Sequence, residues 1–123
     1  MHIEVSEIEL EDVLSKNLEI IEPGLTLINR QYRTKYGKID LFCLDKYGFY
    51  VIVEVKVNPT TNSPGQLAKY ILSIKQEYPD SRVRGLLVAP AIKKDIGELC
   101  RYFNLNFKEI SDLDLTLPTI KFF

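Results

Sequence analysis

Apolar and polar residues recur along the chain with two different periods, which separate predicted helices from predicted strands. Three segments have the 3.6-residue spacing of amphipathic helices: residues 6–18, 63–78 and 93–103. Five shorter segments are rich in β-branched and aromatic residues, as strands are: residues 25–33, 38–44, 49–57, 83–89 and 107–110. The predicted element order is therefore α-β-β-β-α-β-α-β.

Signals at the element ends support this order. Ser6 precedes an acidic first turn, and Glu9 three positions on completes a capping box. Ser63 and Pro64 resemble a helix N-cap followed by proline in the first turn. Residues 45–48 predict a type I turn with a left-handed glycine, which joins two strands in a hairpin. We expect one α/β domain over residues 1–123, with a mixed sheet made of an antiparallel meander and helical crossovers.

Composition limits the possible partners. Hydrophobic residues make up 46% of the 123 residues, enough for one core, and no apolar run nears the roughly 20 residues of a membrane span. No secretory signal is visible, and Cys43 and Cys100 lack metal-site spacing, so we expect buried thiols and a cytoplasmic location. With 16 basic and 17 acidic residues, nucleic-acid binding would require a local basic patch or metal ions.

The most informative feature is a charged pair inside a hydrophobic strand. In residues 49–57 the four valines share one face, while Glu54 and Lys56 lie on the other. A hairpin loop of residues 46–48 sets a register that places Asp40 opposite Glu54. Opposed carboxylates repel, and a divalent cation bound between them would reverse that effect. The pattern predicts metal-assisted phosphodiester hydrolysis, with Lys56 acting on a water or on the phosphate.

Two helices carry further candidates. Gln66 and Tyr70 are four residues apart on one helix face, where Gln66 would hold a water or phosphate oxygen. Tyr70 would orient Lys56 or stack near the substrate, or else pack in the core. Glu7 and Glu11 are also four apart, and one would reach the metal, although the helix dipole alone explains a first-turn glutamate. The alternative for the charged pair itself is an exposed, solvated sheet face.

These residues belong to five ordered blocks: EPGLTLINRQYRT (22–34), GKIDL (37–41), VEVK (53–56), QLAKY (66–70) and VRGLLVAP (83–90). From about residue 6 to residue 110, the chain resembles the C-terminal catalytic domain of the NucS/EndoMS endonucleases of archaea and actinobacteria. That family has the PD-(D/E)XK, restriction-endonuclease-like fold. The resemblance implies a Mg²⁺- or Mn²⁺-dependent DNA endonuclease, a DNA-repair role and an archaeal or archaeal-virus origin.

The resemblance also assigns residues to roles. The implied catalytic residues are Asp40, Glu54, Lys56, Gln66, Tyr70 and Glu7, with Glu11 as the fallback for Glu7. The implied metal ligands are Asp40, Glu54, Glu7 and the carbonyl of Val55. Neutralising phosphates supplies most non-specific affinity for DNA, and the candidates for it are Arg30, Arg33, Lys35 and Lys69, each of which also fits a solvated surface charge.

Two other functions remain open from the sequence. A Holliday-junction-resolvase-like nuclease has the same core and metal chemistry but prefers branched DNA and needs a homodimer. A non-catalytic DNA-binding module would keep the fold without the reaction. NucS/EndoMS proteins usually carry an N-terminal DNA-binding and dimerisation domain that these 123 residues do not include. We therefore expect target selection to need a homodimer or a separate DNA-recognition partner.

Overall fold

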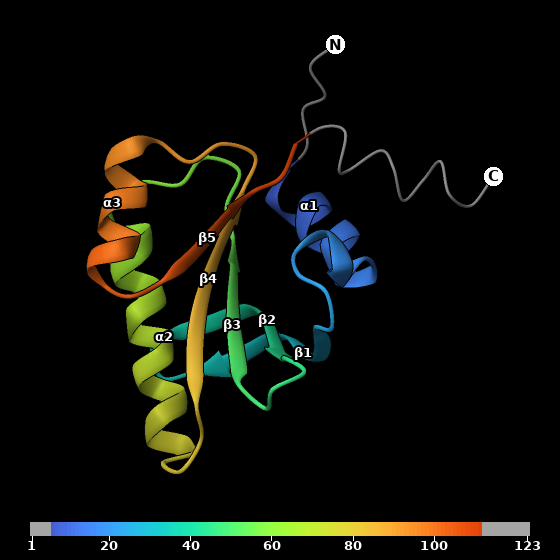
Figure 1. Cartoon of the computed structure of the whole chain (residues 1–123), viewed down its shortest axis with the longest axis vertical. Helices are drawn as coiled ribbons and strands as arrows, with labels where there is room; N and C mark the ends of the chain where they lie inside the picture. Colours follow the sequence, from blue (N-terminus) through green and yellow to red (C-terminus); the bar gives the residue numbers. More distant parts are fainter. Residues whose placement is uncertain (1–5, 112–123) are drawn as a thin grey trace, which may run out of the picture.

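The computed structural model describes residues 6–111, which form a five-stranded mixed sheet with helices on both faces (Figure 1). The strands are β1 (Thr26–Thr34), β2 (Gly37–Leu44), β3 (Tyr50–Val55), β4 (Val83–Ala89) and β5 (Asn106–Glu109). The helices are α1 (Glu7–Lys16), the 3₁₀ helix η1 (Leu18–Ile20), α2 (Ser63–Glu77) and α3 (Lys94–Tyr102). Strands β1 to β3 pair antiparallel and β3 to β5 pair parallel, in the sheet order β1-β2-β3-β4-β5. The α/β fold class with a mixed sheet is confirmed.

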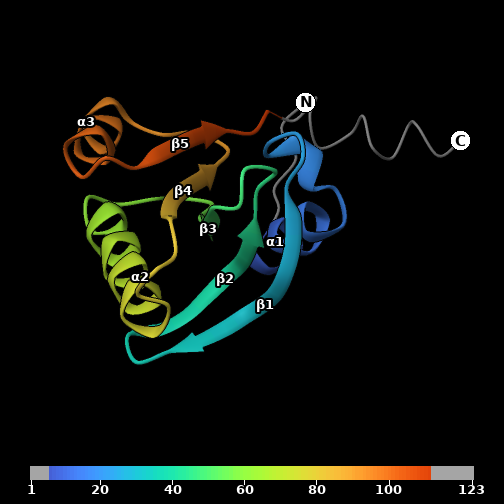
Figure 2. The ribbon, with the colours of Figure 1, turned by 60° about the horizontal axis from the view of Figure 1, so that its bottom comes forward.

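The sheet separates two hydrophobic cores (Figure 2). On one face α1 packs Leu10 and Leu14 against the valines of β3. On the other face α2 and α3 cover the sheet, with Leu67 and Ile74 beside Ile52. The strict alternation of side chains along β3 produces this division, because successive residues of a strand point to opposite faces. Both faces of β3 are therefore covered by other parts of the protein, and Glu54 is buried.

The ends of the elements differ from the sequence prediction by a few residues. Ser6 caps α1 as predicted, accepting the Glu9 backbone N–H at 3.1 Å, but this helix ends at Lys16 and η1 follows it. The expectation that Ser63 is the N-cap of α2 was wrong by one residue, because the helix begins at Ser63 and Asn62 precedes it. Ser63 Oγ instead accepts the Thr60 backbone N–H at 3.0 Å and closes the loop before the helix.

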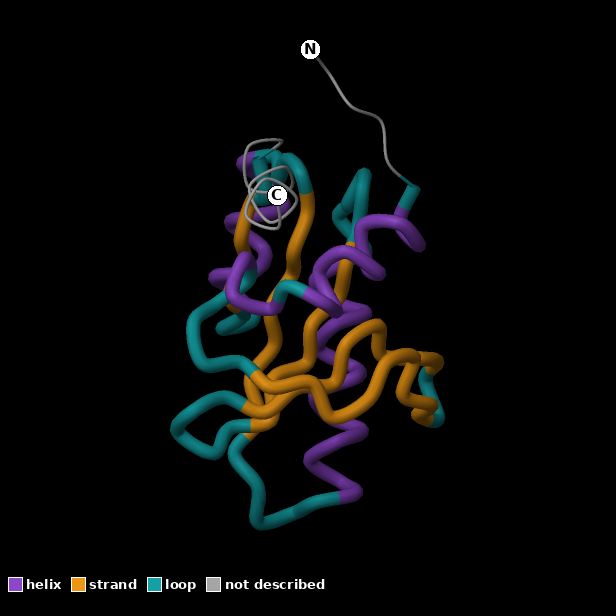
Figure 3. Tube along the Cα trace, turned by 90° about the vertical axis from the view of Figure 1, so that its right-hand side faces the viewer, coloured by secondary structure: helices purple, strands orange, loops and turns teal. Residues whose placement is uncertain are grey.

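The β1–β2 pair bends away from the direction of β3 and β4. In Figure 1 β1 and β2 run across the view while β3 and β4 run along it, and Figure 3 shows the two directions from the side. A bulge lies between Leu27 and Asn29. Ile39 and Leu41 pack in different cores, although a regular strand would place residues two apart on one face. The strand therefore coils at Asp40, which lies between them.

Two smaller expectations also concern the described residues. Cys43 and Cys100 are free and buried, as predicted. In residues 6–111 no helix is both long enough and apolar enough to cross a membrane. The predicted extent of the domain, residues 1–123, includes positions 1–5 and 112–123, which lie outside the described residues.

Candidate active site

Asp40 and Glu54 meet where the β2–β3 ladder ends. The predicted register is confirmed for the four pairs from Leu44↔Tyr50 to Leu41↔Val53. The next position would join Asp40 to Glu54, but there Asp40 Oδ2 accepts the Val55 backbone N–H at 2.8 Å. A side-chain oxygen thus replaces a backbone acceptor, and this bond fixes the Asp40 carboxylate beside β3.

Glu54 is a buried carboxyl group with one unsatisfied oxygen. Its residue is 3% exposed, and its Oε2 atom has no hydrogen-bond partner. Burial raises the pKa of Glu54 well above its usual range, and the adjacent Asp40 carboxyl raises it further, against the smaller opposite effect of Lys56. Buried polar groups are nearly always paired, so this oxygen is suited to bind a cation.

Lys56 and Glu7 form a looser pair at the edge of this site. Lys56 directly follows β3, and its Nζ lies 4.0 Å from Glu7 Oε1. Glu7 Oε2 accepts the Val57 backbone N–H at 3.3 Å, so the first turn of α1 reaches the end of β3. Both side chains are partly exposed, at 28% for Lys56 and 47% for Glu7, so the pair adds little stability but leaves both groups accessible.

Glu11, the fallback for Glu7, approaches Asp40 from the other side. It is buried, and Arg30 donates to its Oε2 at 2.6 Å while Gln31 donates to its Oε1 at 2.6 Å. Burial raises the pKa of Glu11, partly offset by the hydrogen bond from Arg30. The Gln31 amide also lies 3.3 Å from Asp40 Oδ1. Glu7 and Glu11 of α1 therefore both border the site, Glu7 on the Lys56 side and Glu11 on the Asp40 side.

Gln66 and Tyr70 come from α2, on the face of the sheet that carries Glu54. Gln66 Nε2 donates to the Tyr70 hydroxyl at 3.0 Å. The Tyr70 ring is buried in the core, and burial raises the pKa of its hydroxyl, with the charges of Glu54 and Asp40 acting in the same direction. The core and active-site interpretations of Tyr70 are thus compatible, since the ring packs while the hydroxyl lies near the carboxyl groups.

The four predicted DNA-contacting residues differ in whether their side chains are already bound to other residues of the protein. Arg30 is bound to Glu11 and, at 3.1 Å, to Asp12, so its charge is already paired within the acidic cluster. Lys35 donates to Gln76 of α2. Arg33 and Lys69 are exposed. The exposed cations lie on the β1–β2 ribbon and on α2, the elements that carry Asp40 and Gln66.

The residues present fit a divalent metal only with help from backbone and water oxygens. In the part of the chain that the structure describes, no three His, Cys, Asp or Glu side chains gather closely enough to form a metal cluster. Mg²⁺ often takes just one or two carboxylates and keeps several waters. Asp40 and Glu54 meet that need, and Glu54 Oε2 is an oxygen without another partner.

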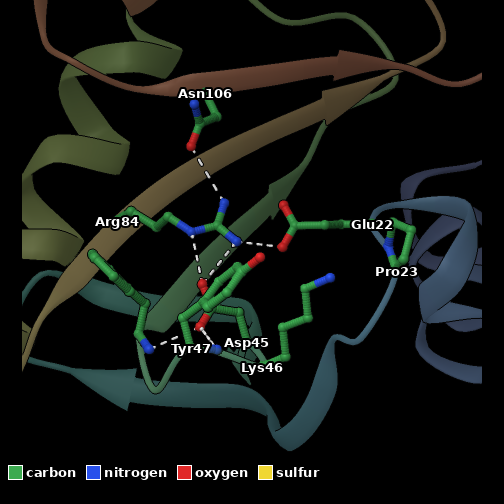
Figure 4. Close-up of a pocket in the computed structure, with 8 residues that line it drawn as sticks. Glu22, Pro23, Asp45, Lys46, Tyr47, Arg84 and Asn106 are labelled. Carbon is green, nitrogen blue, oxygen red and sulfur yellow. Dashed lines mark hydrogen bonds and ion pairs between the residues drawn. The ribbon is translucent and has the colours of Figure 1, made fainter.

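A separate pocket lies at the other end of the β2–β3 hairpin (Figure 4). Its volume is about 450 Å³, and Arg84 lies at its centre between Asp45 and Glu22. The guanidinium donates to Asp45 at 3.1 Å, to Glu22, and to Asn106 at 3.3 Å. These groups satisfy one another's hydrogen-bonding capacity and charge. We therefore interpret the residues that line the pocket as a structural network that connects the β2–β3 hairpin with β4 and β5.

Sequence reasoning missed Gln31 and the role of Arg30. Gln31 lies inside one of the blocks that carry the family resemblance, which was the available signal. Its backbone has a φ of 51°, and neither residue type nor strand alternation indicates that conformation. Arg30 looked like a phosphate contact because charge alone does not reveal a buried partner such as Glu11.

Comparisons with known proteins identify the family of this chain. The model of the family "Endonuclease NucS C-terminal domain" matches residues 6–118. Endonuclease NucS of Methanocaldococcus jannaschii is 32% identical over 107 residues, covering 86% of this chain and 41% of that protein. Endonuclease NucS of Sulfolobus acidocaldarius is 36% identical over 102 residues, covering 82% and 40%. The chain spans about two fifths of the length of these relatives.

Solved structures show the same fold. A complex of EndoMS with double-stranded DNA superposes with a TM-score of 0.79 at 28% identity, covering 90% of this chain and 47% of that one. A repair endonuclease from Pyrococcus abyssi superposes with a TM-score of 0.78 at 30% identity, covering 90% and 49%. Both matches leave about half of the larger protein without a counterpart here.

Proposed function

Because this chain belongs to the endonuclease NucS family through the C-terminal domain, we propose that it is a metal-dependent endonuclease that hydrolyses phosphodiester bonds in DNA. The observation that carries the proposal is the buried Glu54 oxygen, which lacks a partner beside a second carboxylate. A protein without a ligand for this position would hold an unsatisfied carboxyl oxygen beside a second carboxyl group inside its core for no structural benefit.

Asp40 and Glu54 would hold the metal, which is Mg²⁺ or Mn²⁺ in this proposal. Oxygen ligands suit both ions. The N–H and C=O of one strand residue point to the same neighbouring strand, so the Val55 carbonyl faces the side on which its N–H meets Asp40. That carbonyl would be the third protein ligand, with Glu7 approaching from α1. When bound, the ion would supply positive charge that stabilises the phosphate oxygens and would lower the pKa of a water molecule toward neutrality.

The remaining residues position the substrate and neutralise charge. Lys56 carries its ammonium group to the end of β3, where it stabilises the negative charge that develops on the phosphate. Glu7 holds Lys56 loosely, so the ammonium can turn from the glutamate to the substrate. Gln66 orients a phosphate oxygen or the attacking water. Its own side chain is held in place by its hydrogen bond to the Tyr70 hydroxyl. The buried Glu54 gives up its proton as the cation binds, since a nearby positive charge favours the ionised form.

DNA is the proposed partner. One structural neighbour is described as a complex with double-stranded DNA, and Arg33, Lys35 and Lys69 are exposed on the elements that carry the site. Neutralised phosphates would release counterions, so binding should weaken with salt. Target selection by a homodimer or a separate recognition partner is part of the proposal.

The test is cleavage of a panel of labelled DNAs: single-stranded, duplex, mismatched, flapped and four-way. Wild type and Glu54→Ala are compared in Mg²⁺, in Mn²⁺ and in EDTA. The proposal requires cleavage that needs metal and that Glu54→Ala loses by at least about a hundredfold, the effect expected for a group that acts in the transition state.

The substrate preference separates the remaining candidates. Preference for mismatched duplex supports a repair endonuclease, while preference for four-way DNA with paired cuts supports a resolvase-like enzyme. Binding without cleavage, by a folded protein in the presence of metal, would instead identify a DNA-binding module and refute the endonuclease.

A further inference from the structure

Gln31 combines an unfavourable backbone conformation with two contacts to acidic residues. Its φ of 51° lies in the left-handed region, which is costly for a residue with a Cβ. Among residues 6–111, Asn104 is the other non-glycine residue with positive φ, and it follows helix α3, where that conformation is common. Gln31 lies inside β1, where no local turn requires it.

The position of Gln31 in the sheet explains what the conformation achieves. The β1–β2 register pairs Arg30 with Leu41 and Tyr32 with Ile39, so Gln31 lies opposite Asp40. In a regular strand its side chain would follow the pleat. Here the left-handed backbone lets the amide reach Glu11 Oε1 at 2.6 Å and Asp40 Oδ1 at 3.3 Å.

Glu11 serves as the fixed end of this link. It is buried, and Arg30 occupies its other oxygen through Nε at 3.2 Å and Nη2 at 2.6 Å. The remaining oxygen, Oε1, accepts from Gln31. At the far end, Asp40 is held on its second oxygen by the Val55 backbone N–H. The bonds thus run without a break from α1, through β1, to the carboxylate beside Glu54.

We infer that Gln31 is a positioning residue: its amide holds the Asp40 carboxylate in the orientation that binds the divalent metal. The inference rests on the proposed function, because it concerns the same site. Groups that orient a metal ligand typically change metal affinity by 10–100-fold when they are removed. Strained backbone in a fold persists where the surroundings determine it and often marks functional sites.

The experiment measures Mn²⁺ and Ca²⁺ binding to the full chain by calorimetry, and thermal unfolding without metal. Gln31→Met keeps the side-chain length and the Cβ but cannot donate a hydrogen bond. Gln31→Gly also removes the amide, yet glycine adopts this φ without penalty. Gln76→Met, the same substitution at an exposed position of α2, is the matched control.

We expect both Gln31 variants to bind Mn²⁺ about 10–100-fold more weakly than wild type. Without metal, Gln31→Gly should melt at or above Gln31→Met, because it relieves the backbone. Stability and metal affinity would then change independently, which a purely structural role of Gln31 does not produce. Gln76→Met should bind metal as wild type does.

Unchanged Mn²⁺ affinity in both Gln31 variants would overturn this inference while leaving the endonuclease intact, provided that wild type binds metal and cuts DNA. Equal losses in Gln76→Met would overturn it as well, since the effect would not be specific to the Gln31 amide. A wild type that neither binds metal nor cleaves DNA would refute the proposed function, and the role of Gln31 with it.

Discussion

The backbone N–H of Val55 donates to Asp40 Oδ2 at 2.8 Å, in the place where the β2–β3 ladder would otherwise continue. The Asp40 carboxylate therefore has two roles. It accepts the backbone N–H at the end of β3, and it provides a negative charge beside Glu54. Substitutions at Asp40 separate these roles, because the first needs only an acceptor while the second needs a negative charge.

Asp40→Asn should keep the fold and lose the metal. The asparagine oxygen still accepts from Val55, so metal-free unfolding should cost about as much free energy as in wild type. In thermal unfolding, wild type should gain stability from Mn²⁺, about 2.7 kcal/mol at a hundred times Kd. Asp40→Asn should gain almost none.

Asp40→Ala provides the contrast. It removes the acceptor as well, and a buried N–H without a partner costs about 1–3 kcal/mol. We expect this variant to be less stable than Asp40→Asn in the absence of metal. A normal Mn²⁺ response in either variant would show that Asp40 is not a ligand.

The pKa of Glu54 predicts how stability depends on pH. Unfolded chains release this proton near pH 4.5, while the folded protein releases it at much higher pH because the group is buried beside Asp40. Between those two pKa values the folded state binds more protons, so its unfolding free energy falls as pH rises. Glu54→Gln removes the titrating group and with it this pH-dependent fall in the unfolding free energy.

The measurement is urea unfolding of wild type and Glu54→Gln at pH 5 and pH 8.5 without metal. Glu54→Gln should gain stability relative to wild type as pH rises, by at least about 1 kcal/mol, the equivalent of roughly one pKa unit. Glu98→Gln, at an exposed position of α3, should show no such trend. A difference between Glu54→Gln and wild type that stays constant with pH would contradict the assignment.

Much of the site could be predicted because two charged residues interrupt the hydrophobic run of residues 49–57. Side chains alternate strictly in a strand, so Glu54 and Lys56 had to share a face with Ile52, which is buried. The loop of residues 46–48 then fixed the register, which the observed pair Leu41↔Val53 follows. Local rules were sufficient there because the hairpin is short and regular.

The same rules could not predict the β1–β2 ribbon. Its coil depends on the φ of Gln31 and on the bulge near Ile28, and residue type predicts neither feature. Nor does helical spacing show which glutamate of α1 is buried, since Glu7 and Glu11 lie on the same helix face. Only the docking of α1 on the sheet places Glu11 against Arg30.

Glu7 and Glu11 should respond differently to the loss of charge. Glu7→Gln removes an exposed pair with Lys56 and should change the unfolding free energy by less than about 0.5 kcal/mol. Glu11→Gln weakens the buried contact with Arg30 and should cost about 1–3 kcal/mol. Chemical denaturation measures both.

Cleavage assays complete that comparison. If Glu7 is a ligand, Glu7→Gln should reduce metal affinity and cleavage at nearly unchanged stability. Normal metal binding and cleavage in Glu7→Gln would transfer the role to Glu11, the other glutamate that borders the site.

Gly37 and Tyr70 should show a measurable coupling. Gly37 has a φ of 129°, and a Cβ at this position would lie 3.0 Å from the Tyr70 hydroxyl oxygen. Gly37→Ala should therefore destabilise the protein by about 1–3 kcal/mol through backbone strain and the contact together. Tyr70→Phe removes only the hydroxyl and should recover part of that loss in the double variant, by about 0.5 kcal/mol or more. Strictly additive effects in a double-mutant cycle would show that the hydroxyl does not lie against Gly37.

The Arg84 network should affect stability without affecting catalysis. Burial alone would raise the pKa of Asp45, but hydrogen bonds from the backbone of Phe49 and Tyr47 and from Arg84 hold it below its usual value. Arg84→Met leaves this nearly inaccessible carboxylate without its counter-ion, at a cost of about 2–3 kcal/mol. The loss should shrink in acid, because stability from a carboxylate with a lowered pKa disappears as pH falls through that pKa.

Arg82→Met is the matched control, since Arg82 is exposed and contacts the same hairpin at Tyr47 and Phe49. We expect a loss of only about 0.5 kcal/mol there. Denaturation gives both stabilities, and cleavage rates measured well below the melting temperature should equal that of wild type for both variants. A large fall in the cleavage rate of folded Arg84→Met would show that the two ends of the β2–β3 hairpin are coupled. The pocket at Arg84 would then belong to the function rather than to the framework.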